Sequence, residues 1–247
     1  MNEKEIVDSL ILGSLLGDGH IEQARKLNKI ERLGFTQCSK NGKEVEYINL
    51  KHKMISNFYR CNPIINGNNN TIRFSLSTRD PEVVKLTSRM VKILRYPGNK
   101  RKIPDISEFN PVVMLFWYLD DGSLSVGKQK RPNGRKPSIS RRLKITLTSY
   151  RDEDILNFIN EFKNKTGIEF RVSRYKGKIE SINIKKIEEI IKFLDYLSPF
   201  NYLVPEKQKY KLCPCFISKS QKDIYKYNKC EVQNENFCRC REKYFSF

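Results

Sequence analysis

Two aspartates, Asp18 and Asp121, each stand at the end of an apolar segment and directly before a glycine. The segments read ILGSLLGDG over residues 11–19 and MLFWYLDDG over residues 114–122. If two such segments pack together as helices, their carboxylates meet, and like charges at that distance repel unless divalent cations lie between them. Carboxylate oxygens suit Mg²⁺ or Mn²⁺, and such a site can activate water for phosphodiester hydrolysis. The alternative is that both aspartates only cap the ends of helices.

The sequence around these aspartates predicts the elements that position them. Apolar residues over 3–16 are typical of a tightly packed helix, and Asn110 before Pro111 is a start signal for a second one. Residues 32–38 and 142–148 alternate between apolar and polar side chains, as strands do. The other expected elements are helices over 43–59, 81–94, 151–166 and 186–197, and strands over 70–77, 169–175 and 178–185. Together they predict an α+β fold of two pseudo-symmetric α-β-β-α-β-β-α repeats.

With two such motifs and this order of elements, the chain resembles the LAGLIDADG homing endonucleases in their single-chain, two-motif form. The resemblance covers roughly residues 4–212 and implies a saddle of antiparallel sheets with the two motif helices packed at the centre. Gly13 and Gly17 have the spacing of small residues that allows helix backbones to approach closely. Phe116 and Trp117 in the second motif depart from that pattern, so we expect the contact between the helices to be asymmetric.

The resemblance also assigns the metal ligands. It implies that the carboxylates of Asp18 and Asp121, the eighth residue of each motif, hold Mg²⁺ or Mn²⁺. The backbone carbonyls of Gly17 and Asp120 are further candidate ligands. The side chain of Asp120 is the less expected acid, because the matching residue of the first motif is Gly17.

Basic residues near the acids form a second tier of catalytic candidates. Members of this family often place a lysine near the end of each repeat, which points to Lys211 in the second repeat. In the first repeat the same position falls on Arg101, with Lys102 and Lys100 as neighbours, and the sequence does not choose among the three. Arg101 could stabilise charge but could not act as a base. The alternative for each is a plain contact with the phosphate backbone.

The chain carries a net charge of +19 on 247 residues, which favours a polyanionic partner. Charge alone does not separate DNA from RNA. A two-stranded ribbon fits the major groove, where polar side chains on strand faces read base edges. The candidate DNA-binding residues are Arg32, Thr36, Arg73, Ser75, Ser77, Arg142, Lys144, Thr146, Arg171, Ser181 and Asn183. We expect residues 127–140 to form a loop that adds backbone contacts, and His20 to be an exposed loop residue rather than a general base.

The expected domain boundaries are 1–104 for the first repeat, 105–212 for the second, and 213–247 for a Cys-rich basic tail. The tail holds five cysteines: Cys213, Cys215, Cys230, Cys238 and Cys240. They could form a structural Zn²⁺ site, although C-x-C pairs differ from the usual zinc spacing and no histidine is nearby. Reduced thiols without a metal are the alternative.

These observations predict a site-specific, intron-encoded endonuclease that acts as a monomer on double-stranded DNA. We expect a metal-dependent double-strand break in a long, pseudo-palindromic target. An intron maturase that binds RNA on the same scaffold is the alternative, and a DNA-binding regulator without cleavage is a third. Both motif acids favour cleavage, because a pure binder has no need of two carboxylates beside a polyanion.

The sequence also bears on the compartment. No apolar run approaches the length of about 18 residues that a membrane span needs, and the first 19 residues are acidic where a signal peptide is basic. We therefore expect an intracellular protein, in a bacterial or phage-infected cytoplasm or an organelle matrix, with no membrane partner.

Overall fold

The computed structural model describes residues 1–23, 31–38, 43–67, 70–97, 101–129 and 138–212. The chain forms two compact units. The first holds Met1–Asp121 and Ser149–Phe158, and the second holds Gly122–Thr148 and the described residues after Phe158. None of the helices in the described part of the chain has the length and apolar character needed to span a membrane.

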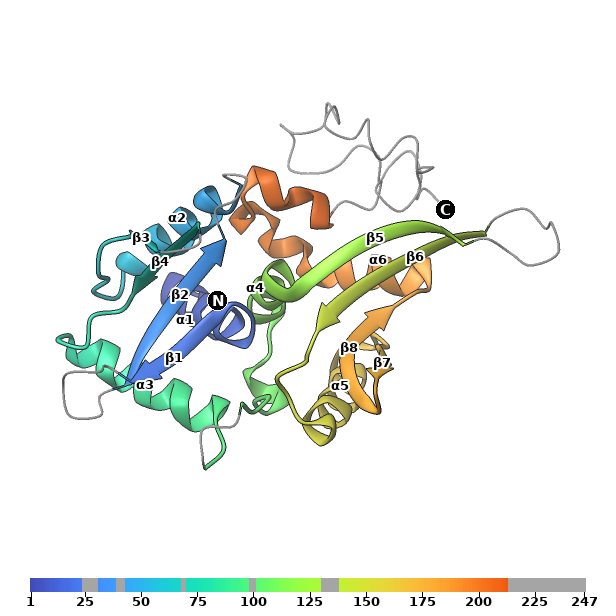
Figure 1. Ribbon diagram of the computed structural model, residues 1–247, viewed down its shortest axis with the longest axis horizontal. Helices are drawn as coiled ribbons and strands as arrows, with labels where there is room; N and C mark the ends of the chain where they lie inside the picture. Colours follow the sequence, from blue (N-terminus) through green and yellow to red (C-terminus); the bar gives the residue numbers. More distant parts are fainter. Residues whose placement is uncertain (24–30, 39–42, 68–69, 98–100, 130–137, 213–247) are drawn as a thin grey trace. The chain divides into compact units, whose positions relative to one another are not determined.

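The first unit contains a four-stranded antiparallel sheet in the order β1-β2-β4-β3 (Figure 1). Its strands are β1 (Gly19–Gln23), β2 (Glu31–Cys38), β3 (Ile65–Gly67) and β4 (Thr71–Ser75). The helices α1 (Glu3–Leu16), α2 (Lys43–Ser56) and α3 (Pro81–Leu94) all contact this sheet. A short turn of 3₁₀-helix, η1 (Ile106–Glu108), precedes α4 (Pro111–Asp121).

The second unit repeats this topology. Its sheet has the order β5-β6-β8-β7 and is antiparallel throughout. The strands are β5 (Gly122–Gln129), β6 (Ser138–Thr146), β7 (Arg171–Tyr175) and β8 (Lys178–Ile184). The helix α5 (Asp152–Thr166) begins in the first unit and ends in the second, and α6 (Ile187–Leu197), η2 (Ser198–Leu203) and η3 (Glu206–Leu212) follow. The predicted α+β class and the repeated α-β-β-α-β-β-α order are therefore confirmed.

The expected loop over residues 127–140 is wrong at both ends. Gly127 pairs with Ser140, Lys128 with Ile139, and Gln129 with Ser138. The β5–β6 ribbon is thus longer than the sequence suggested, because its polar and glycine residues carry no apolar alternation that would mark them as strand. Residues 130–137 lie outside the described part of the chain.

The two motif helices, α1 and α4, pack closely within the first unit. All residues from Val112 to Leu119 of α4 are buried, as expected of a helix that is apolar all round. A Cβ atom on Gly13 would meet the carbonyl oxygen of Val113 and would come within 3.0 Å of the Phe116 Cβ. Gly13 of α1 therefore faces the larger Phe116 of α4, which confirms the predicted asymmetric contact.

The rest of α4 is held by aromatic packing and by a defined start. Asn110 accepts hydrogen bonds from the backbone N–H groups of Val112 and Val113, both at 3.0 Å, which caps the helix. Trp117 is fully buried, with its ring centroid 5.4 Å from that of Phe158. These contacts fix the end of α4, where Asp120 and Asp121 lie.

Candidate metal and nucleic-acid site

The C-terminal ends of α1 and α4 carry three aspartates, Asp18, Asp120 and Asp121. Helix α1 ends at Leu16, Gly17 caps it, and Asp18 lies in the turn before β1. The backbone N–H of Asp18 lies 3.4 Å from Oδ2 of Asp120 and donates to it. Asp18 is exposed and Asp121 is half-buried, whereas the side chain of Asp120 has no exposed surface. Of the two acids predicted as metal ligands, Asp18 is therefore open to solvent.

A buried lysine neutralises the third acid. The Lys51 ammonium lies 2.7 Å from Oδ1 and 2.9 Å from Oδ2 of Asp120, and only 1% of the Lys51 side chain is exposed. Burial raises the pKa of Asp120; the Lys51 ammonium lowers it and the nearby Asp18 carboxylate raises it. The Tyr47 ring packs 4.2 Å from the same ammonium. Burial and the Asp120 carboxylate raise the pKa of the Tyr47 phenol far above its usual value, so it stays neutral.

Gln37 links the buried acid to the exposed one. Its side-chain amide donates to Oδ2 of Asp18 at 2.9 Å and lies 3.5 Å from Oδ1 of Asp120. Gln37 is buried on the core face of β2, in phase with Leu33 and Phe35. One amide group therefore orients the Asp18 carboxylate from within the fold.

Sequence reasoning missed both Gln37 and Lys51, although each carries a signal. Gln37 follows Leu33 and Phe35 at the period of two that defines the core face of a strand. Lys51 stands four residues after Tyr47 and four before Ile55, on the buried stripe of α2. A polar residue at an apolar phase needs a buried partner, and each of these finds one at the site.

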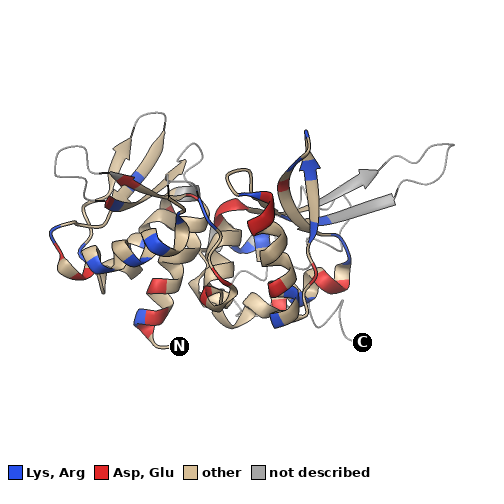
Figure 2. Cartoon of the chain, turned by 90° about the horizontal axis from the view of Figure 1, so that it is seen from below, with Lys and Arg blue, Asp and Glu red and all other residues tan. Residues whose placement is uncertain are grey.

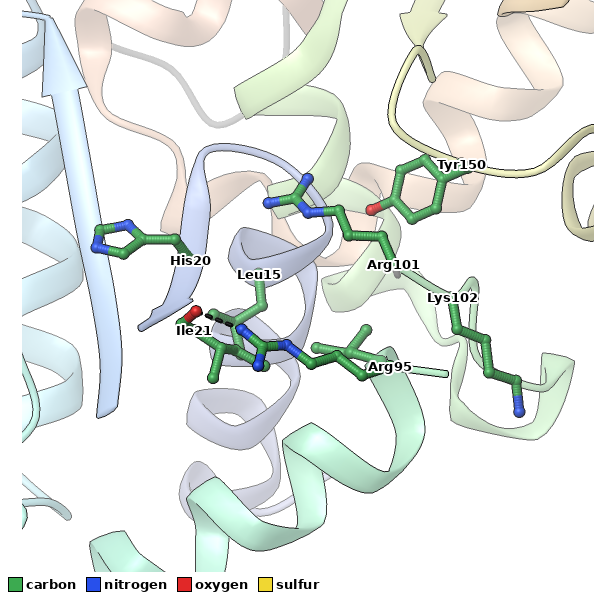
Figure 3. A pocket seen from close by; sticks show the side chains of 8 residues that line it. Leu15, His20, Ile21, Arg95, Arg101, Lys102 and Tyr150 are labelled. Atoms are coloured by element: carbon green, nitrogen blue, oxygen red, sulfur yellow. Dashed lines mark hydrogen bonds between the residues drawn. The ribbon is translucent and has the colours of Figure 1, made fainter. Parts of the chain in front are cut away.

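Arg101 reaches the turn that carries Asp18. Its guanidinium donates to the carbonyl of Gly19 at 2.9 Å, and the Tyr150 hydroxyl donates to the carbonyl of Leu16 at 2.6 Å. Both side chains line a cavity of about 160 Å³ together with His20. Figure 3 shows the Arg101 guanidinium beside the Tyr150 ring, while the Lys102 side chain points away from both. The structure thus places Arg101 at the turn but not Lys102; Lys100 lies outside the described residues.

His20 is not in a loop, contrary to the expectation. It lies on β1, opposite Gly34 of β2, and a Cβ atom on Gly34 would collide with its ring. Burial lowers the pKa of His20; the Glu22 carboxylate opposes this, and Arg32 and other arginines lower it further. Because His20 lies on a strand, its position beside Asp18 and Gly19 is fixed more firmly than it would be in a loop.

The candidate DNA-binding residues of the first unit differ in how they are held. Thr36 of β2 and Arg73 of β4 face each other in register on the outer side of the sheet, and Arg73 is exposed. The Arg32 guanidinium is paired with Glu22 at 2.5 Å, and Ser75 accepts from the Asn62 amide at 2.9 Å. The prediction for Ser77 as a strand-face residue is wrong, because Ser77 lies beyond the end of β4 and is 7% exposed.

In the second unit, two of the predicted contacts are inaccessible. Ser181 and Asn183 of β8 are 0% and 1% exposed, on a strand that lies between β6 and β7. Asn183 instead donates to the backbone carbonyl of Arg171 and to Ser173. The prediction of both residues as exposed base readers is therefore wrong for this structure.

The longer side chains of the same sheet remain accessible. Arg171 is exposed, and Arg142, Lys144 and Thr146 are half-buried. The Arg142 guanidinium donates to Ser173 at 2.9 Å. Lys211 lies in η3 of this unit, and its catalytic role stays a prediction. The five tail cysteines lie outside the described residues, so the zinc site stays a prediction too.

The acids fit a hard divalent cation that is shared with substrate. Within the described ranges, no three His, Cys, Asp or Glu side chains gather into a cluster that could hold a metal alone. An ion bound by Asp18 and Asp121 would therefore complete its shell with backbone carbonyls, water and phosphate oxygens. Mg²⁺ sites with one or two carboxylates are built in this way.

The fold has two sheets of the same topology and two packed helices that each end in an aspartate and a glycine. This arrangement defines a class of nuclease-like proteins with two such motifs in one chain. The chain belongs to the LAGLIDADG DNA endonuclease family, whose model matches residues 8–193.

Curated relatives match most of this chain but only part of their own length. The chain is 26% identical over 212 residues to Protein RecA of Mycobacterium leprae (strain TN), covering 84% of this chain and 28% of that protein. It is 28% identical over 219 residues to Cytochrome b mRNA maturase bI2 of Saccharomyces cerevisiae, covering 83% and 46%. The chain thus spans less than half the length of either relative.

Solved structures share the fold over nearly their whole length. The homing endonuclease I-WcaI bound to its DNA recognition sequence matches with a TM-score of 0.60 and 19% identity, covering 86% of this chain and 88% of that one. The I-LtrWI LAGLIDADG homing endonuclease bound to target DNA matches with a TM-score of 0.57 and 14% identity, covering 98% and 97%. At these identities the likeness establishes the fold.

Proposed function

We propose that this chain is a site-specific homing endonuclease that makes a metal-dependent double-strand break in a long, pseudo-palindromic DNA target. The observation that carries this proposal is the difference in burial among Asp18, Asp120 and Asp121. The side chain of Asp120 is buried against Lys51, whereas Asp18 is exposed and Asp121 is half-buried. Motif carboxylates beside a polyanionic backbone are costly unless cations join them.

The residues of the chain divide the work of phosphodiester hydrolysis. Asp18 and Asp121, with the carbonyls of Gly17 and Asp120, would hold Mg²⁺ or Mn²⁺. When bound, such ions supply an activated water and stabilise the attacking and leaving oxygens. Arg101 lies at the Asp18 turn and could stabilise charge on the scissile phosphate without acting as a base. Lys211 is the corresponding candidate of the second repeat.

The target would be read from the outer faces of the two sheets, with the protein acting as a monomer. The accessible candidates are Arg32, Thr36, Arg73, Ser75, Arg142, Lys144, Thr146 and Arg171. Long basic and polar side chains on a two-stranded ribbon suit the major groove. The homing endonucleases I-WcaI and I-LtrWI were solved in complex with their target DNA, which supports the same partner here.

A second candidate function is RNA binding as an intron maturase. The yeast relative is named a cytochrome b mRNA maturase, and the net charge of +19 suits RNA as well as DNA. Cleavage and RNA binding use different features, so one chain could have both. The two accessible acids favour cleavage as the main activity.

Selection from a randomised duplex library would test this proposal. The protein is incubated with the library and Mg²⁺, cut ends are sequenced, and the assay is repeated with Asp18→Asn and Asp121→Asn. We expect one family of related duplexes to be cut on both strands by the parent protein and not by either variant. If the parent cuts no duplex but binds structured RNA tightly, the maturase function replaces the endonuclease.

Elemental analysis of the purified protein tests the tail separately, because a Zn²⁺ site requires stoichiometric zinc.

A further inference from the structure

We propose that Lys51 and Asp120 form a buried positioning pair that sets the orientation of Asp18. Neither residue of the pair would touch substrate or metal through its side chain. This inference rests on the proposed function, since it assigns Asp18 a role as a metal ligand.

The pair is buried at a place where a lone carboxylate would be unstable. The side chains of Lys51 and Asp120 are 1% and 0% exposed, with their charged atoms 2.7 Å apart. Asp120 lies in the last turn of α4, where the helix dipole disfavours negative charge. The Lys51 ammonium lies 2.7 Å and 2.9 Å from the two Asp120 oxygens and compensates their negative charge.

Stability alone is a weak reason for such a pair. A buried ion pair can often be replaced by apolar residues of similar volume without loss of stability. The geometry around Asp120 indicates what an apolar pair could not do. Its oxygens accept from both Lys51 and the backbone N–H of Asp18, and the Gln37 amide lies 3.5 Å away.

The connection to Asp18 runs through two separate groups. The Asp120 carboxylate holds the backbone of Asp18 directly. It also faces the Gln37 amide, which donates to the Asp18 carboxylate at 2.9 Å. Because an ionised carboxylate only accepts hydrogen bonds, it can meet several converging donors at once, whereas an asparagine in its place would turn an N–H group toward them.

The first motif has no side chain at the position that matches Asp120. The residue that matches Asp120 in α1 is Gly17, and a Cβ atom there would lie 3.1 Å from the Oδ2 atom of Asp120. The absence of a side chain at Gly17 makes the room that Asp120 occupies. One helix therefore supplies the carboxylate and the other supplies the space for it.

The decisive variant is the double substitution Lys51→Met with Asp120→Asn, which removes both charges and nearly preserves volume. Lys53→Met is the matched control, because Lys53 lies on the same helix and is exposed. For each full-length protein we would measure thermal unfolding, Mn²⁺ affinity by electron paramagnetic resonance, and the single-turnover rate on a selected duplex. Duplex affinity in Ca²⁺ would be measured alongside.

We expect the double variant to unfold near the parental temperature and to bind duplex normally. Its Mn²⁺ affinity and cleavage rate should fall by about 10–100-fold, as when a group that orients a metal ligand is lost. Parental Mn²⁺ affinity and rate in the double variant would overturn the proposal, since a purely structural pair predicts that result.

Two further variants keep the test decisive. If the double variant unfolds early, Gln37→Leu removes the amide link while leaving the buried pair intact, and it should show the same loss of Mn²⁺ affinity. Parental affinity in Gln37→Leu would then overturn the proposal. Asp18→Asn distinguishes failure of the proposed metal site from failure of the positioning role. If this variant binds Mn²⁺ as the parent does, the metal site of the proposed function is wrong, and the positioning role is wrong with it.

Discussion

The ends of α1 and α4 carry the same Asp-Gly signature but differ in their chemistry. At the end of α1, Gly17 has no side chain and Asp18 points to solvent. At the end of α4, Asp121 is half-buried, and the side chain of Asp120 is buried against Lys51. The repeat therefore determines how the helices pack, whereas the charge of the site depends on a residue outside both motifs, on α2.

The two ends of α1 also differ. Its first turn carries Glu3 and Glu5, with Asn2 as the cap, and Figure 2 shows this acidic turn, marked by the N-terminus, at the end of the first unit away from its strands. Acids suit a helix N-terminus and oppose the dipole at a C-terminus. The acids of the N-terminal turn need no further compensation, whereas those of the site do.

The largest expected effect is on catalysis by the accessible acids. Asp18→Asn and Asp121→Asn should each lower the single-turnover cleavage rate by at least about 10³-fold, because each removes a metal ligand worth several kcal/mol of transition-state stabilisation. Gel assays on a selected duplex measure this, and duplex binding in Ca²⁺ serves as the control. Double-strand cleavage at the parental rate by either variant would rule out that acid as a ligand.

Removing the partner of the buried acid Asp120 should lower the stability of the fold. Lys51→Met leaves the Asp120 carboxylate buried without its partner, which should lower the free energy of unfolding by about 3–5 kcal/mol. Asp18→Asn, at the exposed acid, should change it by less than about 0.5 kcal/mol, as surface substitutions usually do. Urea unfolding followed by circular dichroism measures both. Equal losses in the two variants would contradict the division between buried and accessible acids.

The next largest effect on stability should come from enlarging Gly13, where α1 packs against α4. Gly13→Ala places a methyl group against the carbonyl oxygen of Val113, a backbone atom that cannot rotate away. Overpacking of this kind costs about 1–3 kcal/mol, observable as a lower urea midpoint. An unchanged midpoint would show that α1 and α4 approach less closely than the structure has them.

The smallest effects should distinguish accessible from buried polar residues of the two sheets. Arg73→Ala removes an exposed guanidinium and should weaken binding to a selected duplex by about 1–3 kcal/mol if Arg73 contacts a base. Ser181→Ala should leave binding within about twofold, since a fully buried hydroxyl forms no such contact. Filter binding at fixed salt measures both. A larger loss with Ser181→Ala than with Arg73→Ala would reverse the assignment.

Much of the fold could be predicted because it depends on local patterns. The helix expected over residues 81–94 is α3, Pro81–Leu94, because Asp80, Pro81 and the apolar period all mark its start. The Asp-Gly ends located Asp18 and Asp121 at the ends of two helices that do pack together. Those features repeat in the sequence, and repetition made them detectable.

The missed residues depend on contacts between distant parts of the chain. Lys51 lies on α2 and meets Asp120 of α4 only in the folded unit. Ser181 and Asn183 alternate like exposed residues, but both are buried, and Asn183 donates to the Arg171 carbonyl and to Ser173 on β7. Alternation predicts which face of a strand a residue is on, whereas the accessible surface of that face depends on the strands beside it.

The central claim is that Asp18 and Asp121 bind the metal while Asp120 serves as an internal counter-ion. A crystal structure of the protein with a selected duplex and Mn²⁺, with anomalous scattering used to locate the metal, would test it most directly. We expect Mn²⁺ bound to the carboxylates of Asp18 and Asp121, with Asp120 still paired to Lys51. An ion bound to the carboxylate of Asp120, or none on Asp18, would contradict it.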